Sequence, residues 1–418
     1  ALAFMSAPDF ESPTDSDGNN SYIVEVTASD GTNNDTQTIT VTIQNLNDNS
    51  PVITSDGGAA SASINVNENS TAVTTVTATD ADALAALSYS ITGGSDQTAF
   101  GLVSSTGVLT LNAAADFETP ADNDGNNSYI VEVTVTDGTN TDVQTITVNI
   151  QDQEDNPPVI TSDGGAATAS LNVNENSTSV TTVTAADADA ISTVTYSLSG
   201  GSDQALFSIN SSTGALAFMS APDFESPTDS DGNNTYIIEV TASDGTNSDT
   251  QTITVNLQNL NDTSPVITSN GGAATASLNV NENSTSVTTI TATDADALAA
   301  LSYSITGGAD QAAFGLVSST GVLTLNTALD FETPADNDGN NSYIVEVTVT
   351  DGTNTDVQTI TVNVQDLEDN TPVITSDGGA ATASLKDNEN ETAITTDMAT
   401  DADAISTLTY SLSGGADQ

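Results

Sequence analysis

Four prolines, Pro51, Pro158, Pro265 and Pro372, stand 107 residues apart, and each closes a segment rich in acids or amides. The segment before Pro158 begins at Asp152 and places three carboxylates within four residues. A fixed period of this length is the signature of a tandem array, in which each repeat is one folding unit. The prolines therefore mark the joints of an array.

The period predicts three whole units, at residues 50–156, 157–263 and 264–370, with half-units at 1–49 and 371–418. The decapeptide Ala1–Phe10 recurs unchanged from Ala215 to Phe224, so two kinds of unit alternate. We expect the sequence to be a window from a longer polypeptide. The other interpretation is that successive chains complete each other's half-units head to tail by strand complementation.

Charge and composition exclude several classes of partner. The chain has 58 acidic residues, one lysine, no arginine and no histidine, which gives a formal charge of −57. Such a surface repels nucleic acid and anionic membranes. Cysteine is absent, so no disulfide can form, and no apolar run is long enough to span a membrane.

Each unit contains short segments with strand periodicity, separated by turn residues. In unit 50–156, the residues of 129–135 alternate in polarity, and Asp137-Gly138 turns the chain into a second alternating run, 146–150. Ser105-Thr106-Gly107 predicts a hairpin. We expect one strand at 75–79 and about seven strands in all, which is typical of a Greek-key β-sandwich. The predicted fold is all-β: tandem seven-stranded sandwiches joined end to end into a rod.

The acids recur at fixed places in every whole unit. In unit 50–156 they are Glu68 within Asn-Glu-Asn, the pair Asp80 and Asp82, Asp116 and Glu118 in Asp-Phe-Glu, Asp137 and the linker acids. This set resembles the cadherin repeat, whose motifs are an N-terminal Glu, DxD, DRE, a late Asp and a DxNDNxP linker. The resemblance covers the whole chain.

The resemblance implies calcium ions at each joint. The Glu, the DRE-like motif and the linker of one unit would supply ligands together with the DxD motif and late Asp of the next. In chain order, the residues implied as ligands are Asp9, Glu11, Asn47, Asp48, Asn49, Glu68, Asp80, Asp82, Asp116, Glu118, Asp137, Asp152, Glu154, Asp155, Asn156, Glu175, Asp187, Asp189, Asp223, Glu225, Asp244, Asn261, Asp262, Glu282, Asp294, Asp296, Asp330, Glu332, Asp351, Asp366, Glu368, Asp369, Asn370, Asp401 and Asp403.

Elementary chemistry points the same way. Two carboxylates about 4 Å apart repel by about 4 kcal/mol at an effective dielectric constant of about 20. With neither His nor Cys, the chain offers only hard oxygen ligands, which favours calcium over zinc or copper. The alternative is that the acids form a solvated, solubilising surface.

The joints depart from the family pattern at several positions, which include Thr263 in place of the last linker Asn and Glu154 and Glu368 in place of another Asn. Phe117, Phe224 and Phe331 replace the DRE arginine, which is not among the implied ligands. Asn45 and Asn259 replace the first acid of two linkers. The sequence therefore predicts joints that alternate between tight and weak calcium binding.

Two further features leave alternatives open. The loop from Asp122 to Asn127 looks like another calcium loop but fails the EF-hand spacing, and Asp-Gly and Asn are also common turn residues. Lys386 and its neighbours break the repeat, through drift or through contact with another chain.

The sequence predicts no enzyme, because the usual catalytic bases and nucleophiles are missing. The resemblance implies a calcium-rigidified stalk of a bacterial cell-surface adhesin, extracellular, with calcium and further repeats of the same or neighbouring chains as partners. The alternatives are a fibre or sheath assembled head to tail or laterally, and homophilic adhesion. Animal cadherins use an N-terminal Trp strand for adhesion, and this chain has no Trp.

Overall fold

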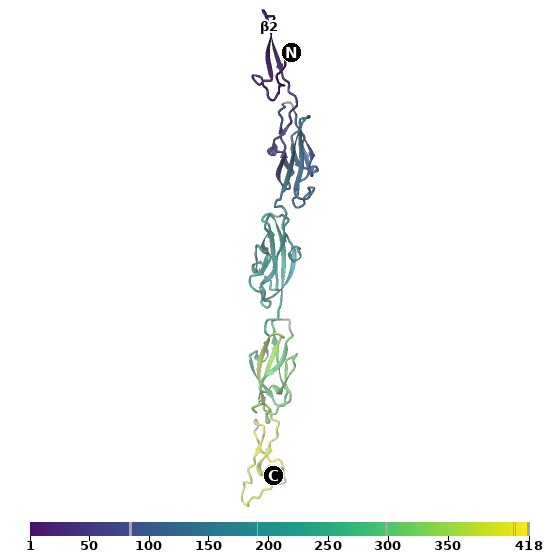
Figure 1. Cartoon of the computed structure of the whole chain (residues 1–418). Helices are drawn as coiled ribbons and strands as arrows, with labels where there is room; N and C mark the ends of the chain where they lie inside the picture. The colour runs from purple at the N-terminus through teal and green to yellow at the C-terminus, as the bar shows by residue number, and fades with distance from the viewer. Residues whose placement is uncertain (83–85, 190, 297–299, 404, 406, 416–418) are drawn as a thin grey trace.

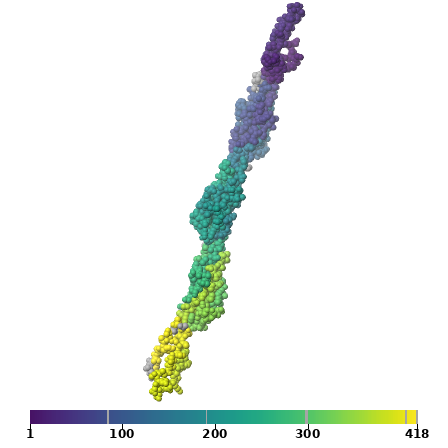
Figure 2. Space-filling model, turned by 90° about the vertical axis from the view of Figure 1, so that its left-hand side faces the viewer, coloured from purple at the N-terminus to yellow at the C-terminus, as the bar shows by residue number. Residues whose placement is uncertain are grey.

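The computed structural model describes residues 1–82, 86–189, 191–296, 300–403, 405 and 407–415. The molecule is a long thin rod in which three β-sandwiches follow one another, with a half-unit at either end (Figures 1 and 2). Within the described residues all regular structure is strand, apart from seven short 3-10 turns: η1 (Ser55–Gly57), η2 (Gln97–Ala99), η3 (Ser162–Gly164), η4 (Gln204–Leu206), η5 (Ser269–Gly271), η6 (Gln311–Ala313) and η7 (Ser376–Gly378). The all-β prediction is confirmed. Over the same residues, no helix has the length and apolar character needed to cross a bilayer.

The first complete sandwich is built from short strands joined by tight turns. Its strands are β3 (Val52–Ile53), β4 (Ser61–Asn67), β5 (Ala72–Thr75), β6 (Ala78–Thr79), β7 (Ser88–Gly93), β8 (Phe100–Leu102), β9 (Val108–Leu111), β10 (Ser128–Thr136) and β11 (Thr141–Gln151). One sheet has the order β4-β11-β10-β7, and β4 runs parallel to β11. The facing sheet has the order β5-β9-β8, and β3 pairs with β6.

The single strand predicted at 75–79 is wrong in one respect, because the chain changes partners there. β5 pairs with β9, whereas β6 pairs with β3. Between them, the Val76 N–H donates to the Gly107 carbonyl at 2.8 Å. Gly107 has φ +70°, and a Cβ there would lie 2.0 Å from the Val76 carbonyl oxygen, so this predicted turn requires glycine. When β3 with β4 and β5 with β6 are each counted as one interrupted strand, seven strands remain, as predicted.

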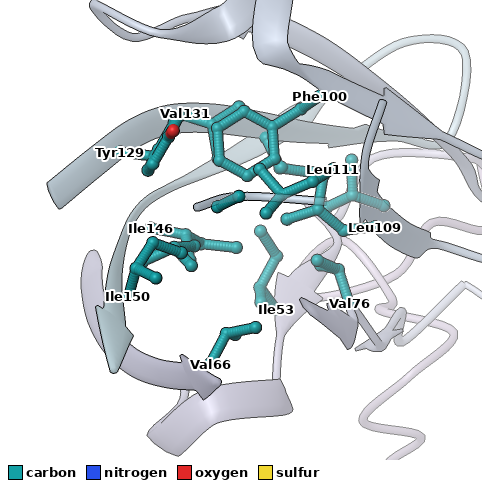
Figure 3. Packing of buried hydrophobic residues seen from close by; sticks show 14 residues of the cluster. Ile53, Val66, Val76, Phe100, Leu109, Leu111, Tyr129, Val131, Ile146 and Ile150 are labelled. Atoms are coloured by element: carbon teal, nitrogen blue, oxygen red, sulfur yellow. The ribbon is translucent and has the colours of Figure 1, made fainter. Parts of the chain in front are cut away.

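The core forms where the two sheets face each other, and it consists mainly of β-branched residues and leucine (Figure 3). Val131 and Val133 of β10 and Ile146 and Val148 of β11 have no exposed surface. The alternation read from the sequence therefore identifies the inward face correctly. The hydrophobic effect of this dry interior holds each unit together without disulfides.

The other two sandwiches repeat this plan. The second contains β12 (Val159–Ile160), β13 (Thr168–Asn174), β14 (Ser179–Thr182), β15 (Ala185–Ala186), β16 (Thr195–Gly200), β17 (Phe207–Ile209), β18 (Ala215–Phe218), β19 (Thr235–Ser243) and β20 (Ser248–Gln258). The third contains β21 (Val266–Ile267), β22 (Thr275–Asn281), β23 (Ser286–Thr289), β24 (Ala292–Thr293), β25 (Ser302–Gly307), β26 (Phe314–Leu316), β27 (Val322–Leu325), β28 (Ser342–Thr350) and β29 (Thr355–Gln365).

The half-units carry fewer strands. Residues 1–49 contain the hairpin of β1 (Ser21–Ser29) and β2 (Asn34–Thr42), and the C-terminal half-unit contains β30 (Val373–Ile374) and β31 (Ala399–Thr400), which pair with each other. The last strand of each sandwich leads directly into a linker, so every set of linker acids lies where one unit meets the next (Figure 1).

Candidate metal centre at the joints

Each whole sandwich has a buried glutamate at the end from which its linker leaves, and backbone N–H groups hold this side chain by hydrogen bonds. Glu68 follows β4 and is 4% exposed. One of its carboxylate oxygens accepts a hydrogen bond from the Phe117 N–H and the other from the Gln153 N–H, both at 2.7 Å. Glu175 and Glu282 are held in the same way. The phenylalanine in place of the DRE arginine therefore contributes its backbone to the site.

At the joint after the first sandwich, carboxylates from two units converge. Oxygens of Glu68, Glu118 and Asp152 all lie within 4.8 Å of one another. Oxygens of Glu118, Asp155 and Asp189 form a second such group. Glu118 belongs to both groups, so the geometry offers two adjacent oxygen cages that share one carboxylate.

The linker is hydrogen-bonded to the next unit through Asp189. The backbone N–H groups of Asp155 and Asn156 donate to Asp189 Oδ2 at 2.9 and 2.7 Å. The Asn156 side-chain amide donates to Asp189 Oδ1 at 2.8 Å and to Glu118 Oε2 at 3.1 Å. Burial alone would raise the pKa of Asp189, but these donors outweigh it and lower the pKa below its ordinary value.

A further group of acids lies on the side of the next unit. Burial raises the pKa of Glu154, and the negative charges of Asp244 and Asp187 raise it further. The Ser192 hydroxyl donates to Glu154 Oε1 at 2.9 Å. Backbone N–H groups at 246 and 247 hold Asp244 at 2.6 Å. The three carboxylates thus face one another across the joint.

The joint carries strong like-charge repulsion. Burial raises the pKa of Glu118, and the charges of Glu68, Asp152 and Asp189 add to that increase. The sequence has one lysine in 418 residues, so side-chain cations cannot balance four joints. Like charges held this close require a counter-charge to remain ionised together.

The joint after the second sandwich brings four carboxylates into one group. Oxygens of Glu175, Glu225, Asp262 and Asp296 lie within 4.8 Å of one another. Burial, a hydrogen bond with Asp296 and the charge of Glu175 raise the pKa of Glu225 to about 7. The Thr263 N–H donates to Asp296 Oδ2 at 2.7 Å, as Asn156 does to Asp189.

The two outer joints follow the same plan. At the first, Glu11, Asp48 and Asp82 form one group, and Asp80, Asp82 and Asp137 another. At the last, the backbone N–H groups of Asp369 and Asn370 donate to Asp403 Oδ2 at 2.9 and 2.8 Å. Asn370 also reaches Glu332 Oε2 at 3.0 Å. Each joint therefore places a DxD motif beside the linker that precedes it.

Many joint oxygens are buried yet accept no hydrogen bond from the protein. Among the described residues, such oxygens belong to Glu11, Asn45, Asp80, Glu118, Asp187, Glu225, Asp244, Asn259, Asn261, Asp294, Asp296 and Glu332. A buried acceptor without a partner is costly and points to an absent water or ion. An oxygen-only donor set of this density fits calcium, which takes six to eight oxygen ligands.

Some predicted ligands do not belong to the carboxylate groups described above. Asp116 accepts a hydrogen bond from the Thr119 N–H at 2.9 Å, Asp223 from the Glu225 N–H at 3.0 Å, and Asp330 from the Glu332 N–H at 3.1 Å. Asp9 accepts from the Glu11 N–H at 3.0 Å. These bonds shape the loops that present the neighbouring glutamates. Glu368 is exposed, in contrast to half-buried Glu154.

The structure adds a residue type that sequence reasoning missed. The side-chain amide of Asn69 donates to Asp155, that of Asn176 to Asp262 and that of Asn283 to Asp369. These bonds orient one linker carboxylate at each of three joints. The recurring Asn-Glu-Asn motif contained this signal, in the Asn that follows the buried Glu.

The Asp122–Asn127 loop is a hydrogen-bonded turn. Asp122 accepts from the backbone N–H groups of Asn126 and Asn127 at 2.8 and 3.1 Å, and Asp96 accepts from Asn123 at 2.7 Å. Protein donors thus engage these carboxylates, which supports the turn interpretation.

The chain is similar to known proteins along most of its length. A family model of the cadherin domain matches residues 61–151, 169–258 and 276–365. Human protocadherin Fat 1 is 30% identical over 419 residues, covering 96% of this chain and 9% of that protein. Human protocadherin-15 is 29% identical over 329 residues, covering 76% of this chain and 16% of the relative. The chain thus spans a small fraction of these relatives.

Solved structures share the fold. The protocadherin GammaB4 extracellular domain superposes with a TM-score of 0.62 at 23% identity, covering 96% of this chain and 63% of that one. Mouse cadherin-23 EC22-24 gives a TM-score of 0.55 at 23% identity, covering 77% of this chain and all of that one. These likenesses establish tandem sandwiches in a rod.

Proposed function

This chain belongs to the cadherin domain family, and on that premise we propose that it is a calcium-stiffened stalk on the outside of a cell. Cadherin domains are generally calcium-binding modules with a structural role, and the chain is not an enzyme. The solved relatives include the extracellular domain of protocadherin GammaB4. We keep the unit boundaries predicted from the 107-residue period as part of this proposal.

The observation that carries the proposal is the convergence of acids at every joint. Glu118 belongs to two groups of carboxylates drawn from two successive units, and one of its oxygens is buried without a hydrogen-bond partner. A divalent cation would supply the missing positive charge and coordinate those oxygens. The rest of each sandwich is held by its own apolar core and does not need the ion.

The chain's own residues explain why such an ion would stiffen the rod. Glu68 is fixed to the first sandwich by two backbone N–H groups. Asp189 belongs to the second sandwich and accepts hydrogen bonds from the linker at 155–156. Glu118 lies against both sets, so a cation held there would join two rigid bodies. Without it, carboxylates about 4 Å apart repel by about 4 kcal/mol per pair at an effective dielectric constant of about 20, which favours opening of the joint.

The proposal supports an extracellular location for the chain, but it does not identify the organism. A calcium-dependent joint suits the outside of a cell, where calcium is millimolar, the range of extracellular calcium modules. The bacterial adhesin expected from the sequence stays a prediction, since the reported relatives are human and mouse proteins.

Small-angle scattering of the full chain tests the proposal. We expect a long rigid rod in millimolar calcium and a broad, shorter distribution of lengths after exhaustive dialysis against EDTA. Magnesium at the same concentration should not restore the rod, because it keeps its own waters. Glu132→Gln removes one negative charge from a strand away from the joints. This control should give the same lengths as the wild type in calcium and in EDTA. An unchanged maximum dimension in EDTA would contradict the proposal.

A further inference from the structure

A glutamine interrupts the apolar row that the last strand of each sandwich turns toward the core. In β11 the residues Ile146, Val148 and Ile150 are buried, and Gln144 lies in the same alternating row with no exposed surface. Its side-chain amide donates to the Ala59 carbonyl oxygen at 2.8 Å. Because a carbonyl only accepts, this bond fixes which end of the amide is nitrogen and directs Oε1 elsewhere. The buried oxygen therefore needs a partner from another part of the unit.

In the third sandwich the equivalent oxygen has a donor. Gln358 is 1% exposed, and its amide nitrogen donates to the Ala273 carbonyl oxygen at 2.8 Å. Its Oε1 accepts a hydrogen bond from the side-chain amide of Asn270, in the turn η5, at 3.1 Å. Asn270 Oδ1 in turn accepts from the Thr288 hydroxyl at 3.1 Å. One asparagine thus links the buried glutamine to the threonine and satisfies both.

The first two sandwiches have an aspartate at the position of Asn270. Asp56 and Asp163 lie in the same turn of their units and share its left-handed backbone, with φ +50° and +52° against +54° for Asn270. The Thr74 hydroxyl donates to the two carboxylate oxygens of Asp56 at 3.1 and 3.2 Å, as Thr288 donates to Asn270. Because backbone and threonine bond are alike, a carboxylate oxygen of Asp56 takes the place of the asparagine nitrogen.

This exchange sets two acceptors against each other. Among the described residues, Gln144 Oε1 and Gln251 Oε1 are buried and have no hydrogen-bond partner, and both glutamines belong to sandwiches with aspartate in the turn. Gln358, opposite the asparagine, has its partner. An ionised carboxylate and an amide oxygen both accept hydrogen bonds and neither donates. A positive charge between them would satisfy the buried oxygen and balance the carboxylate.

We propose that a hard cation binds between the carboxylate of Asp56 and the buried amide oxygen of Gln144. The same site recurs in the second sandwich between Asp163 and Gln251, and in the third the Asn270 amide replaces the ion. The ligands are oxygens alone, which suits sodium or calcium rather than zinc or copper. With a single carboxylate, the site would hold calcium more weakly than the joints do, because affinity follows the number of charged ligands. None of these residues is an implied joint ligand.

Hydrogen exchange of the full chain, followed by mass spectrometry of its peptides, tests this proposal. The wild type is compared at equal ionic strength in sodium-free EDTA with choline chloride, in EDTA with sodium chloride, and in choline chloride with calcium. The cation that binds should slow exchange at 55–60 and 141–146 about tenfold, because opening of the turn must release it. The equivalent amides at 269–274 and 355–360 lie as close to a joint, so they report the effect of calcium at the joints alone.

Two reciprocal substitutions convert the two kinds of turn into each other. Asp56→Asn copies the third sandwich, an arrangement into which this chain already folds, and it should remove the cation response at 55–60. Asn270→Asp makes the reverse change and should give 269–274 the cation response of the first sandwich. Glu132→Gln removes a negative charge from β10, away from this turn. This control should exchange as the wild type does in every buffer.

The outcomes distinguish an ion from a water molecule. If neither cation slows exchange at 55–60 more than at 269–274, the two oxygens are bridged by water only and the proposal fails. It also fails if Asp56→Asn keeps the cation response or if Asn270→Asp does not acquire it. None of these outcomes bears on the stiffness of the rod, which scattering measures separately.

Discussion

The joints after the first and second sandwiches share a frame but differ in charge. Both hold a buried glutamate by two backbone N–H groups and bind a DxD aspartate through the linker backbone. At the first, the linker supplies Asp152 and Glu154, whereas at the second Asn259 and Asn261 occupy the same places. Backbone geometry is thus constant while the number of carboxylates varies.

The equivalent linker residues Glu154 and Asn261 have different surroundings at the two joints. Glu154 faces Asp187 and Asp244, which raise its pKa, and Ser192 donates to it. Asn261 instead donates to the Thr353 hydroxyl at 3.2 Å, while its own oxygen is buried without a partner. The acidic joint has more repulsion to lose on binding a cation, so we predict that it binds calcium more tightly.

Removal of a shared ligand should have the largest effect. Glu118→Ala takes a carboxylate from both groups at the first of these joints. We expect calcium affinity there to fall by more than the 10- to 100-fold (about 1.4 to 2.8 kcal/mol) typical of outer-shell losses, since a direct ligand is removed. Pairs of dyes on cysteines placed either side of each joint would report its bending, and the chain has no cysteine of its own to interfere.

The matched control is Glu132→Gln, which lies outside the joints. If Glu118→Ala loosens the joint after the second sandwich as much as the joint after the first, Glu118 does not act locally and the contrast between the two joints is wrong.

Exchange of linkers should have the next largest effect. Asn259→Asp with Asn261→Glu converts the second of these joints to the acidic kind, and Asp152→Asn with Glu154→Asn makes the reverse change. Because calcium affinity follows the number of charged ligands, we expect about a tenfold change in opposite directions. Calorimetric titration measures both, and equal affinities before and after exchange would refute the alternation of tight and weak joints.

Loss of an outer-shell hydrogen bond should have a smaller effect. Ser192→Ala removes the donor to Glu154 and leaves every carboxylate in place. We expect calcium affinity at that joint to fall by no more than about tenfold, the lower end of outer-shell effects. Isothermal titration against Ser95→Ala, a serine away from the joints, provides the comparison, and a larger loss would mean that Ser192 itself binds the ion.

Much of this comparison could be predicted from the sequence, and the missing part has a physical reason. Periodicity located the linkers, and alternation identified the buried faces of β10 and β11. The role of Asn69 and the division of the 75–79 strand could not be read in this way. They depend on which backbone groups meet across the sandwich, a relation between residues far apart in sequence that no local pattern records.

The smallest expected effect is a pH dependence of calcium affinity at the joint after the second sandwich, which contains Glu225. Burial, Asp296 and Glu175 raise the pKa of Glu225 to about 7 from an ordinary 4.5. A raised carboxyl pKa means that, without calcium, the contribution of Glu225 to the stability of the folded joint is fully present below pH 4.5 and is lost as the pH rises to about 7. Calcium must displace that proton, so its affinity at this joint should decline as the pH falls below 7. Glu225→Gln should remove the pH dependence between 5 and 7 while weakening binding, whereas a persisting proton release in calorimetry would assign the titration to another group.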